Sequence, residues 1–276
     1  MQPTSSAPTQ PAWSASLGLT LGDRAGRTRI RSLRHHGPLR IQRAFHPEGD
    51  GTAHVVVLHP PAGLVGGDRL DVEIDVEEGA RALVTTTGAG KTYRSDGRQA
   101  ETLTSARVSD GAYLELVPQE TVVFDGAHAG LCTSVSLAAT AELLAWEVIC
   151  LGRPACGERF DRGRLRCALE VSREGHLLFS ERGTVAGGDP ALDAPWGFGG
   201  LPAFGTLVAT AGAVDALRVA VADHAGPAAV TRLDDLRVVR VAGRDGVHVR
   251  AALERARHAV RDAWRRPRLD PAIWRS

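Results

Sequence analysis

Residues 70–77 read Leu-Asp-Val-Glu-Ile-Asp-Val-Glu and give the clearest alternation of apolar and acidic residues in the chain. Successive side chains of a β-strand point to opposite faces, so a period of two predicts a strand. Leu70, Val72 and Ile74 are expected to face a core, and the carboxylates between them to face away from it. We interpret the acidic ladder as one solvated face of an edge sheet; a surface that attracts cations is the alternative.

Similar short runs of alternating residues fill most of the chain between residues 15 and 245, separated by Gly, Pro and Asp. Strands that recur about every 8–12 residues favour a sandwich, a barrel or a strand-rich coil over alternating βαβ units. We therefore predict a mainly β, sandwich-like body with a few α-helices and no repeat of fixed period. Strands are expected at residues 16–23, 28–34, 39–45, 53–58, 70–76, 80–86, 101–108, 113–117, 121–124, 132–138, 164–171, 176–181 and 204–210.

Two segments depart from the strand pattern. Residues 247–264 repeat apolar side chains three or four positions apart, from Leu253 to Trp264, and Pro267 follows them. This spacing predicts a helix near the C-terminus that ends before the proline. Residues 141–151 (AELLAWEVICL) fit either a buried helix or a buried strand, and their first half favours a helix.

Length and composition are those of an ordinary globular protein. With 276 residues, 24% charged and 43% hydrophobic, the chain is unlike disordered or collagen-like sequences. No apolar run approaches the roughly 18 residues of a membrane-spanning helix. Residues 1–14 predict a disordered N-terminal lead without a secretory signal, and residues 15–276 a single domain.

Composition also bears on nucleic-acid binding and on the cellular compartment. A net charge of +1 offers no overall field for nucleic acid, where a clustered basic footprint is expected. The chain has no asparagine that glycosylation would need, and its four cysteines form no C-x-x-C pair. A reducing, cytoplasmic environment is therefore the expectation.

The single lysine of the chain, Lys91, lies in a segment that approaches a phosphate-binding loop. Residues 85–92 read TTTGAGKT, close to the pattern G-x-x-x-x-G-K-[ST]. Thr85 replaces the first glycine, and residues 93–99 carry a turn signal where such a loop must open a helix. A tight glycine turn between two strands, with Lys91 at its rim, explains the segment better than a nucleotide site.

Four segments stand out by their order and spacing: residues 59–68 (HPPAGLVGGD), 83–95 (LVTTTGAGKTYRS), 116–127 (LVPQETVVFDGA) and 144–155 (LAWEVICLGRPA). Taken together, they resemble the UreD family of urease accessory proteins, called UreH in some bacteria. The resemblance extends to residues 27–48 and 271–274, and so covers nearly the whole chain beyond residue 15. Departures such as Ala62, where a glycine is usual, affect only local turns and the packing of the terminus.

This resemblance implies a non-enzymatic accessory protein with an all-β, superhelical arrangement of strands and a few helices. UreD-like proteins bind apo-urease and a UreF-like helical partner, which recruits the UreG-like GTPase that delivers nickel. Ni²⁺ would be a transient cargo that passes through an internal, water-filled tunnel towards the urease active site. No permanently bound cofactor, nucleotide site, nucleic-acid partner or membrane contact is implied.

Five carboxylates are candidates for such a conduit: Asp68, Glu120, Asp125, Glu147 and Glu181. A conduit needs ligands that release the ion, and partly hydrated carboxylates suit this better than a complete His/Cys cage. Carboxylates in apolar surroundings need a partner or water. For Glu147 the competing explanation is a buried salt bridge to Arg153 or Arg182, and for the first three candidates it is turn capping or hydrogen bonding at a strand end.

A metal-dependent hydrolase that uses the His and Asp residues before position 76 is the alternative function. The histidines of this region include His35, His36, His46, His54 and His59. Their spacings match no compact ligand set such as H-x-H or H-E-x-x-H, so we favour surface or core roles for them.

The C-terminal residues 250–275 carry eight arginines against three carboxylates. One explanation is a solvated helix face. The other is a partner-facing surface that includes Arg261 and Arg265, with Trp264 and Trp274 as aromatic anchors.

Overall fold

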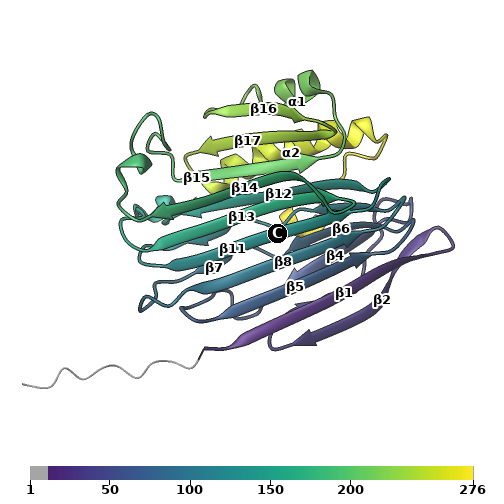
Figure 1. Cartoon of the computed structure of the whole chain (residues 1–276), viewed down its shortest axis with the longest axis horizontal. Coiled ribbons are helices and arrows are strands. Elements are labelled where there is room, and N and C mark those ends of the chain that lie inside the picture. Colours follow the sequence, from purple (N-terminus) through teal and green to yellow (C-terminus); the bar gives the residue numbers. More distant parts are fainter. Residues whose placement is uncertain (1–11, 276) are drawn as a thin grey trace, which may run out of the picture.

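The chain crosses repeatedly between two stacked β-sheets (Figure 1), and the computed structural model describes residues 12–275. Sheet A contains, in spatial order, β14 (His176–Ala186), β13 (Arg164–Arg173), β11 (His128–Leu137), β8 (Ala100–Val108), β5 (Arg69–Val76), β1 (Ser14–Arg24) and β2 (Arg27–His36). Sheet B contains β16 (Ala228–Leu233), β17 (Leu236–Gly243), β15 (Ala203–Ala209), β12 (Glu142–Leu151), β9 (Tyr113–Leu116), β6 (Arg81–Thr86), β4 (Ala53–Leu58) and β3 (Arg40–Ile41). Two short strands, β7 (Gly90–Thr92) and β10 (Thr121–Val123), pair with each other, and β10 also pairs with β12.

Strands in the middle of each sheet are parallel because the chain returns to the same sheet after one full coil. From β5 in sheet A the chain passes through β6 in sheet B and back to β8, which lies parallel to β5 with Leu103 opposite Asp71. The same step joins β8 to β11 and β11 to β13. This β-solenoid confirms the predicted mainly β, superhelical body, and its coils form a structural repeat without a fixed period in the sequence.

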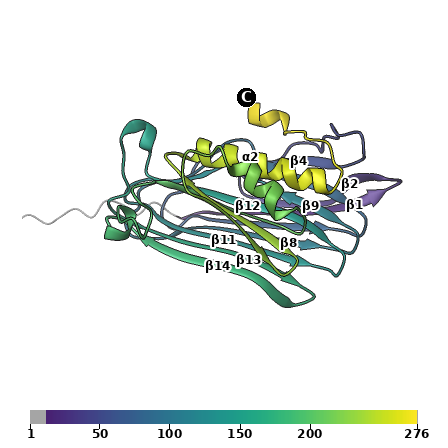
Figure 2. The same cartoon turned by 90° about the horizontal axis from the view of Figure 1, so that it is seen from above.

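In residues 12–275, two α-helices accompany the sheets, α1 (Val214–Val221) and α2 (Gly246–Ala263), together with the 3-10 turns η1 (Pro154–Cys156), η2 (Pro190–Leu192) and η3 (Ala272–Arg275). The predicted C-terminal helix is confirmed as α2, which begins where the Asp245 side chain accepts a hydrogen bond from the His248 backbone N–H. Figure 2 shows α2 on the face of sheet B that points away from sheet A, so the molecule has three layers.

The helix expected in the first half of residues 141–151 is wrong, because Glu142–Leu151 forms β12. Sheet A covers one face of this strand and α2 covers the other. A strand that is buried on both faces has a continuous apolar run without a period of two, and such a run does not distinguish strand from helix.

The acidic strand β5 lies between β1 and β8 within sheet A. Its carboxylates do face outward: Asp71 pairs with Arg69 and Asp75 pairs with Arg107 on the solvent side of sheet A. Ile74 is 1% exposed on the opposite side, as the alternation predicts.

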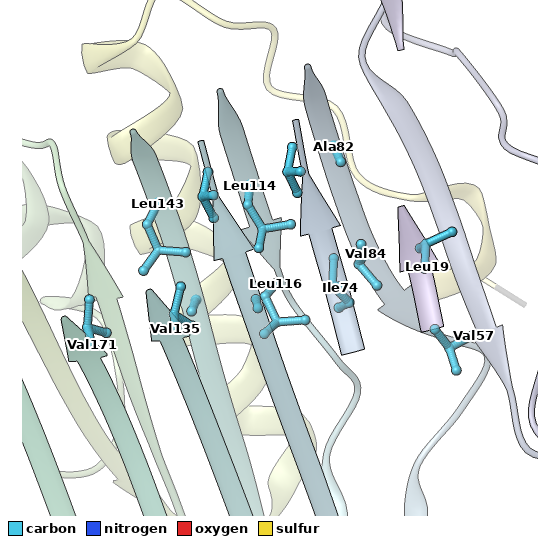
Figure 3. Packing of buried hydrophobic residues seen from close by; sticks show 14 of the residues in the cluster. Leu19, Val57, Ile74, Ala82, Val84, Leu114, Leu116, Val135, Leu143 and Val171 are labelled. Atoms are coloured by element: carbon cyan, nitrogen blue, oxygen red, sulfur yellow. The ribbon is translucent and has the colours of Figure 1, made fainter. Parts of the chain in front are cut away.

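The core consists of two apolar layers. Between the sheets, side chains such as Leu19, Ile74, Leu114 and Val135 pack against one another (Figure 3). Between sheet B and α2, a second layer includes Trp146, Val239, Leu253 and Val260. Alternation along β12 sends Leu143, Ala145, Glu147, Ile149 and Leu151 into the first of these layers.

A buried cluster of charges joins α2 to sheet B. Glu115 of β9 is 0% exposed and forms ion pairs with Arg257 and Arg261 of α2, which are also fully buried. Arg261 pairs in addition with the buried carboxylate of Glu48, and the Tyr113 hydroxyl donates to Glu115. Burial alone would raise the pKa of Glu115, but the two guanidinium groups outweigh it and hold that pKa below its ordinary value.

The C-terminal arginines are therefore divided between core and surface. Arg261 is in the core, so its predicted place on a solvated or partner-facing surface is wrong, whereas Arg265 is exposed. The two tryptophans are partly buried against sheet B: Trp264 packs edge-on against Tyr113, and Trp274 packs against Trp146. The prediction for Arg261 was wrong because the local sequence does not show Glu48 and Glu115, the carboxylates with which this side chain pairs.

Replacing one partner of the buried cluster should destabilise the protein strongly. Glu115→Gln leaves Arg257 and Arg261 buried without their shared charge, which typically costs about 3–5 kcal/mol. The matched control is Asp262→Asn, which removes an exposed pair with Arg268 and should cost less than about 1 kcal/mol. Urea unfolding of the purified proteins measures the free energy of unfolding of both variants. Equally small decreases in the two variants would contradict the claim that the buried cluster holds α2 against sheet B.

Candidate functional site

Two cavities that are partly open to solvent lie between the sheets and share part of one wall. Their volumes are about 610 Å³ and about 460 Å³, and Glu147 and Ile149 line both of them. Both residues are on the face of β12 that points towards sheet A. The two spaces together extend along the interior on either side of the Glu147 carboxyl group.

The first cavity has walls of apolar side chains and threonine hydroxyls. Inward positions of β8 and β11 contribute Thr102, Thr104 and Thr133. Two of the distinctive loops of the sequence border the same space, through His59 of residues 59–68 and Lys91 of residues 83–95. The hydroxyl groups give this part of the interior neutral oxygen atoms, which are weak ligands for a cation.

His59 has an unusual environment within its loop. Its Nε2 atom is buried and has no hydrogen-bond partner in the part of the chain that the structure describes. Burial lowers the pKa of His59, and the nearby Asp68 charge opposes this effect. Its ring also packs against Trp13, with the ring centroids 5.4 Å apart.

The second cavity contains charged side chains as well as apolar ones. Glu181 of β14 pairs with Arg240 of β17 through an Oε1–Nε distance of 3.0 Å, and both side chains line the space. The other carboxylate oxygen of Glu181, Oε2, is buried and has no hydrogen-bond partner among the described residues. The Cys167 thiol lies on the same wall, and burial raises its pKa to about 11, so it is a neutral thiol at neutral pH.

Glu147 is the carboxylate at the junction of the two cavities. The Thr133 hydroxyl donates to Glu147 Oε1 at 2.5 Å across the gap between the sheets. The predicted salt-bridge partners are engaged elsewhere, since Arg153 pairs with Glu158 and Arg182 with Glu170. The buried salt bridge considered for Glu147 is therefore wrong.

The protonation of Glu147 is set by its surroundings. Burial raises the pKa of Glu147 to about 7, the Thr133 hydrogen bond opposes the rise, and the Glu181 charge adds to it. A carboxyl group with this pKa exchanges between neutral and charged forms near neutral pH. It is thus suited to respond to a cation that arrives beside it.

The other three candidate carboxylates lie outside both cavity walls. Asp68 accepts hydrogen bonds from two backbone N–H groups, at 2.9 and 3.3 Å. Asp125 accepts from two further backbone N–H groups and pairs with Arg162 at 2.5 Å. Glu120 pairs with Arg250 of α2 at 3.2 Å. The structure thus brings Glu147 and Glu181 to one space and gives the remaining three local partners.

Several groups that line the cavities were not candidates in the sequence analysis, namely Thr133, Cys167 and Arg240. The first two occupy inward positions of alternating strands, where apolar residues are usual, and this mismatch was the available signal. Arg240 lies on β17, a strand that the sequence did not predict.

The described residues form neither of the two alternative sites considered for this sequence, a hydrolase metal centre and a phosphate-binding loop. Within residues 12–275, no three His, Cys, Asp or Glu side chains converge as a metal-ligand set, so the hydrolase alternative has no such centre there. Thr86 ends β6 and Gly90 begins β7, which confirms that the TTTGAGKT segment is a turn between strands. None of the helices in the described part of the chain is both long and apolar enough to cross a bilayer.

Comparison with known proteins now decides the family. A family model described as UreD urease accessory protein matches residues 14–275. The chain belongs to the UreD family of urease accessory proteins. It is similar to the urease accessory protein UreD of Azoarcus sp. (strain BH72), with 44% identity over 85% of this chain and 84% of that one. The UreD of Pseudomonas fluorescens (strain Pf0-1) is 40% identical over 99% of this chain and 98% of its own.

The raised pKa of Glu147 predicts a pH-dependent stability. A carboxyl group with a pKa near 4.5 in the unfolded chain and about 7 in the folded one is harder to ionise in the folded state. Its contribution to stability is therefore present at low pH and is lost as the pH rises through about 7. Relative to the wild type, Glu147→Gln should gain about 2 kcal/mol in free energy of unfolding between about pH 5 and about pH 8.

Urea unfolding at the two pH values measures this difference. The matched control is Glu170→Gln, since Glu170 pairs with Arg182 on the outer side of sheet A and its pKa lies below the ordinary value. A difference between wild type and Glu147→Gln that stays constant with pH would show that the carboxyl group is already charged at low pH.

Proposed function

We propose that this protein is a scaffold of urease maturation that helps to deliver Ni²⁺ to the active site of apo-urease, and that the ion travels between the two sheets. Membership of the UreD family supports the role in urease maturation. The observation that carries the route is the pair of cavities that share Glu147 and Ile149.

The chemistry of the cavity walls suits an ion that must move on. Removing a divalent cation from water into an apolar interior is costly, so the route has to keep the ion hydrated or offer oxygen atoms in place of water. Both cavities have room for several water molecules. Threonine hydroxyls and single carboxylates hold Ni²⁺ more weakly than a set of His and Cys ligands, and therefore release it.

Glu147 has a specific part in this proposal. An arriving cation stabilises the carboxylate form, so Glu147 loses its proton as the ion approaches and regains one after the ion has passed. The Thr133 hydroxyl orients the carboxyl group, and Glu181 offers the next carboxylate on the wall of the second cavity. The ion thus contacts single carboxylates at separate points of the route and is never held by a complete set of protein ligands.

The proposed partners follow from the family. Apo-urease receives the ion, a UreF-like protein binds this chain, and a UreG-like GTPase supplies nickel together with the nucleotide chemistry. In this account the chain is not an enzyme, holds no permanent cofactor, carries Ni²⁺ only as cargo and works in the cytoplasm.

Co-expression of a urease operon with variants of this chain tests the proposal. Glu147→Ala and Glu181→Ala should leave urease folded but poor in nickel, with its activity and its bound nickel reduced several-fold together. Glu170→Ala, which removes a carboxylate from the outer side of sheet A, should leave both near the wild-type level.

Nickel content by mass spectrometry and urease activity are measured on the same purified samples. Full nickel loading when the gene for this chain is deleted would reject the role in maturation. Full loading with both interior variants would reject the two carboxylates as points on the route.

A further inference from the structure

Positive charge is concentrated at one end of the molecule. Between Asp23 and Glu48 the chain has seven arginines, three histidines and no carboxylate, although its overall net charge is only +1. The remainder of the chain therefore carries a net charge of −6. Four of these arginines are on β2, namely Arg27, Arg29, Arg31 and Arg34, and Arg24 ends the neighbouring strand β1.

Most of this charge is not neutralised by neighbouring side chains. Arg24, Arg29 and Arg34 are exposed and form no ion pair within the described residues, and Arg31 lies 3.9 Å from Glu77, at the limit of an ion pair. Two other outward-facing arginines of sheet A, Arg69 and Arg107, are paired at shorter distances. The strand therefore presents a strong positive potential to solvent.

The backbone of the same strand is open. Among residues 12–275, β2 is the last strand of sheet A and pairs only with β1, at the end of the molecule away from β16 and α1 (Figure 1). In the described part of the chain, the Thr28 N–H, which donates to Gly51, is the only backbone donor of β2 with a backbone acceptor outside the pair with β1. Leu33 is 40% exposed beside Arg34 and adds an apolar contact point.

We propose that β2 is a docking edge for an acidic, extended segment of a partner protein. The segment adds a strand to sheet A through main-chain hydrogen bonds and places alternate carboxylates against Arg29, Arg31 and Arg34. The arginines also make the edge selective: two copies of β2 repel each other, which prevents self-pairing, whereas an acidic strand is attracted. A nucleic acid fits less well, since β2 has no Phe, Tyr or Trp on which bases stack.

The test uses the full-length chain and a fluorescent peptide of alternating Glu and Thr that matches the 10 residues of β2 in length. Anisotropy should report binding at low salt that weakens as NaCl is added. The double variant Arg29→Glu/Arg34→Glu should bind at least about tenfold more weakly. The control Arg164→Glu/Arg166→Glu has the same net charge as that variant and should bind like the wild type. It alters two exposed arginines of β13 that form no ion pair with any residue of the described range 12–275.

A second readout separates strand addition from general attraction. The peptide should slow amide hydrogen exchange in β2 and leave β13 unchanged. Absence of binding, equal losses in both double variants, or unchanged exchange in β2 would each overturn the proposal. So would tighter binding of a single-stranded oligonucleotide of equal charge. Circular dichroism confirms folding, and Arg34→Gln replaces the double variant if that protein does not fold.

Discussion

The alternation of the chain between two sheets is the constraint on which the other features depend. Each coil adds one strand to sheet A and one to sheet B, so the inner faces of two largely parallel sheets meet along the length of the body. Parallel ladders satisfy the backbone groups within the sheets, and side chains alone determine what occupies the layer between them. Where threonine, cysteine or glutamate replaces a large apolar residue at an inward position, that layer contains cavities lined by oxygen and sulfur atoms.

The buried ion pairs that hold α2 against sheet B also affect the space between the sheets, because they keep one face of β12 covered. The fully buried ion pairs of Glu115 with Arg257 and Arg261 connect the helix to β9, and the helix lies over β12, β15 and β17. The helix covers the Trp146 face of β12, so the opposite face, with Glu147, is open only towards the space between the sheets. Burial of the strand on both sides is the reason that the pKa of Glu147 rises.

Local sequence patterns predicted the elements but not their neighbours. The alternation in residues 70–76 gave strand β5 and its inward face, yet the position of β5 inside sheet A depends on coils distant in the chain. Strand β16 was not predicted because its side chains are mostly exposed and show no period of two. Arg261 resembles a surface residue of a helix, and only contact with Glu115, 146 residues away, places it in the core. Glu147 was a candidate because a carboxylate interrupts an apolar run, while its partner Thr133 is visible only in three dimensions.

The most direct test of the interior route is to close it where the two cavities share Ile149. Ile149→Phe extends into the volume of the cavities, so the fold and the outer surfaces are retained, and Ile149→Val is the matched control that leaves the passage open. Nickel bound to urease is measured after co-expression with each variant, together with co-purification of the accessory complex. The account predicts that both complexes assemble and that only Ile149→Phe gives urease with several-fold less nickel. Fully loaded urease with a folded, complex-forming Ile149→Phe protein would contradict it.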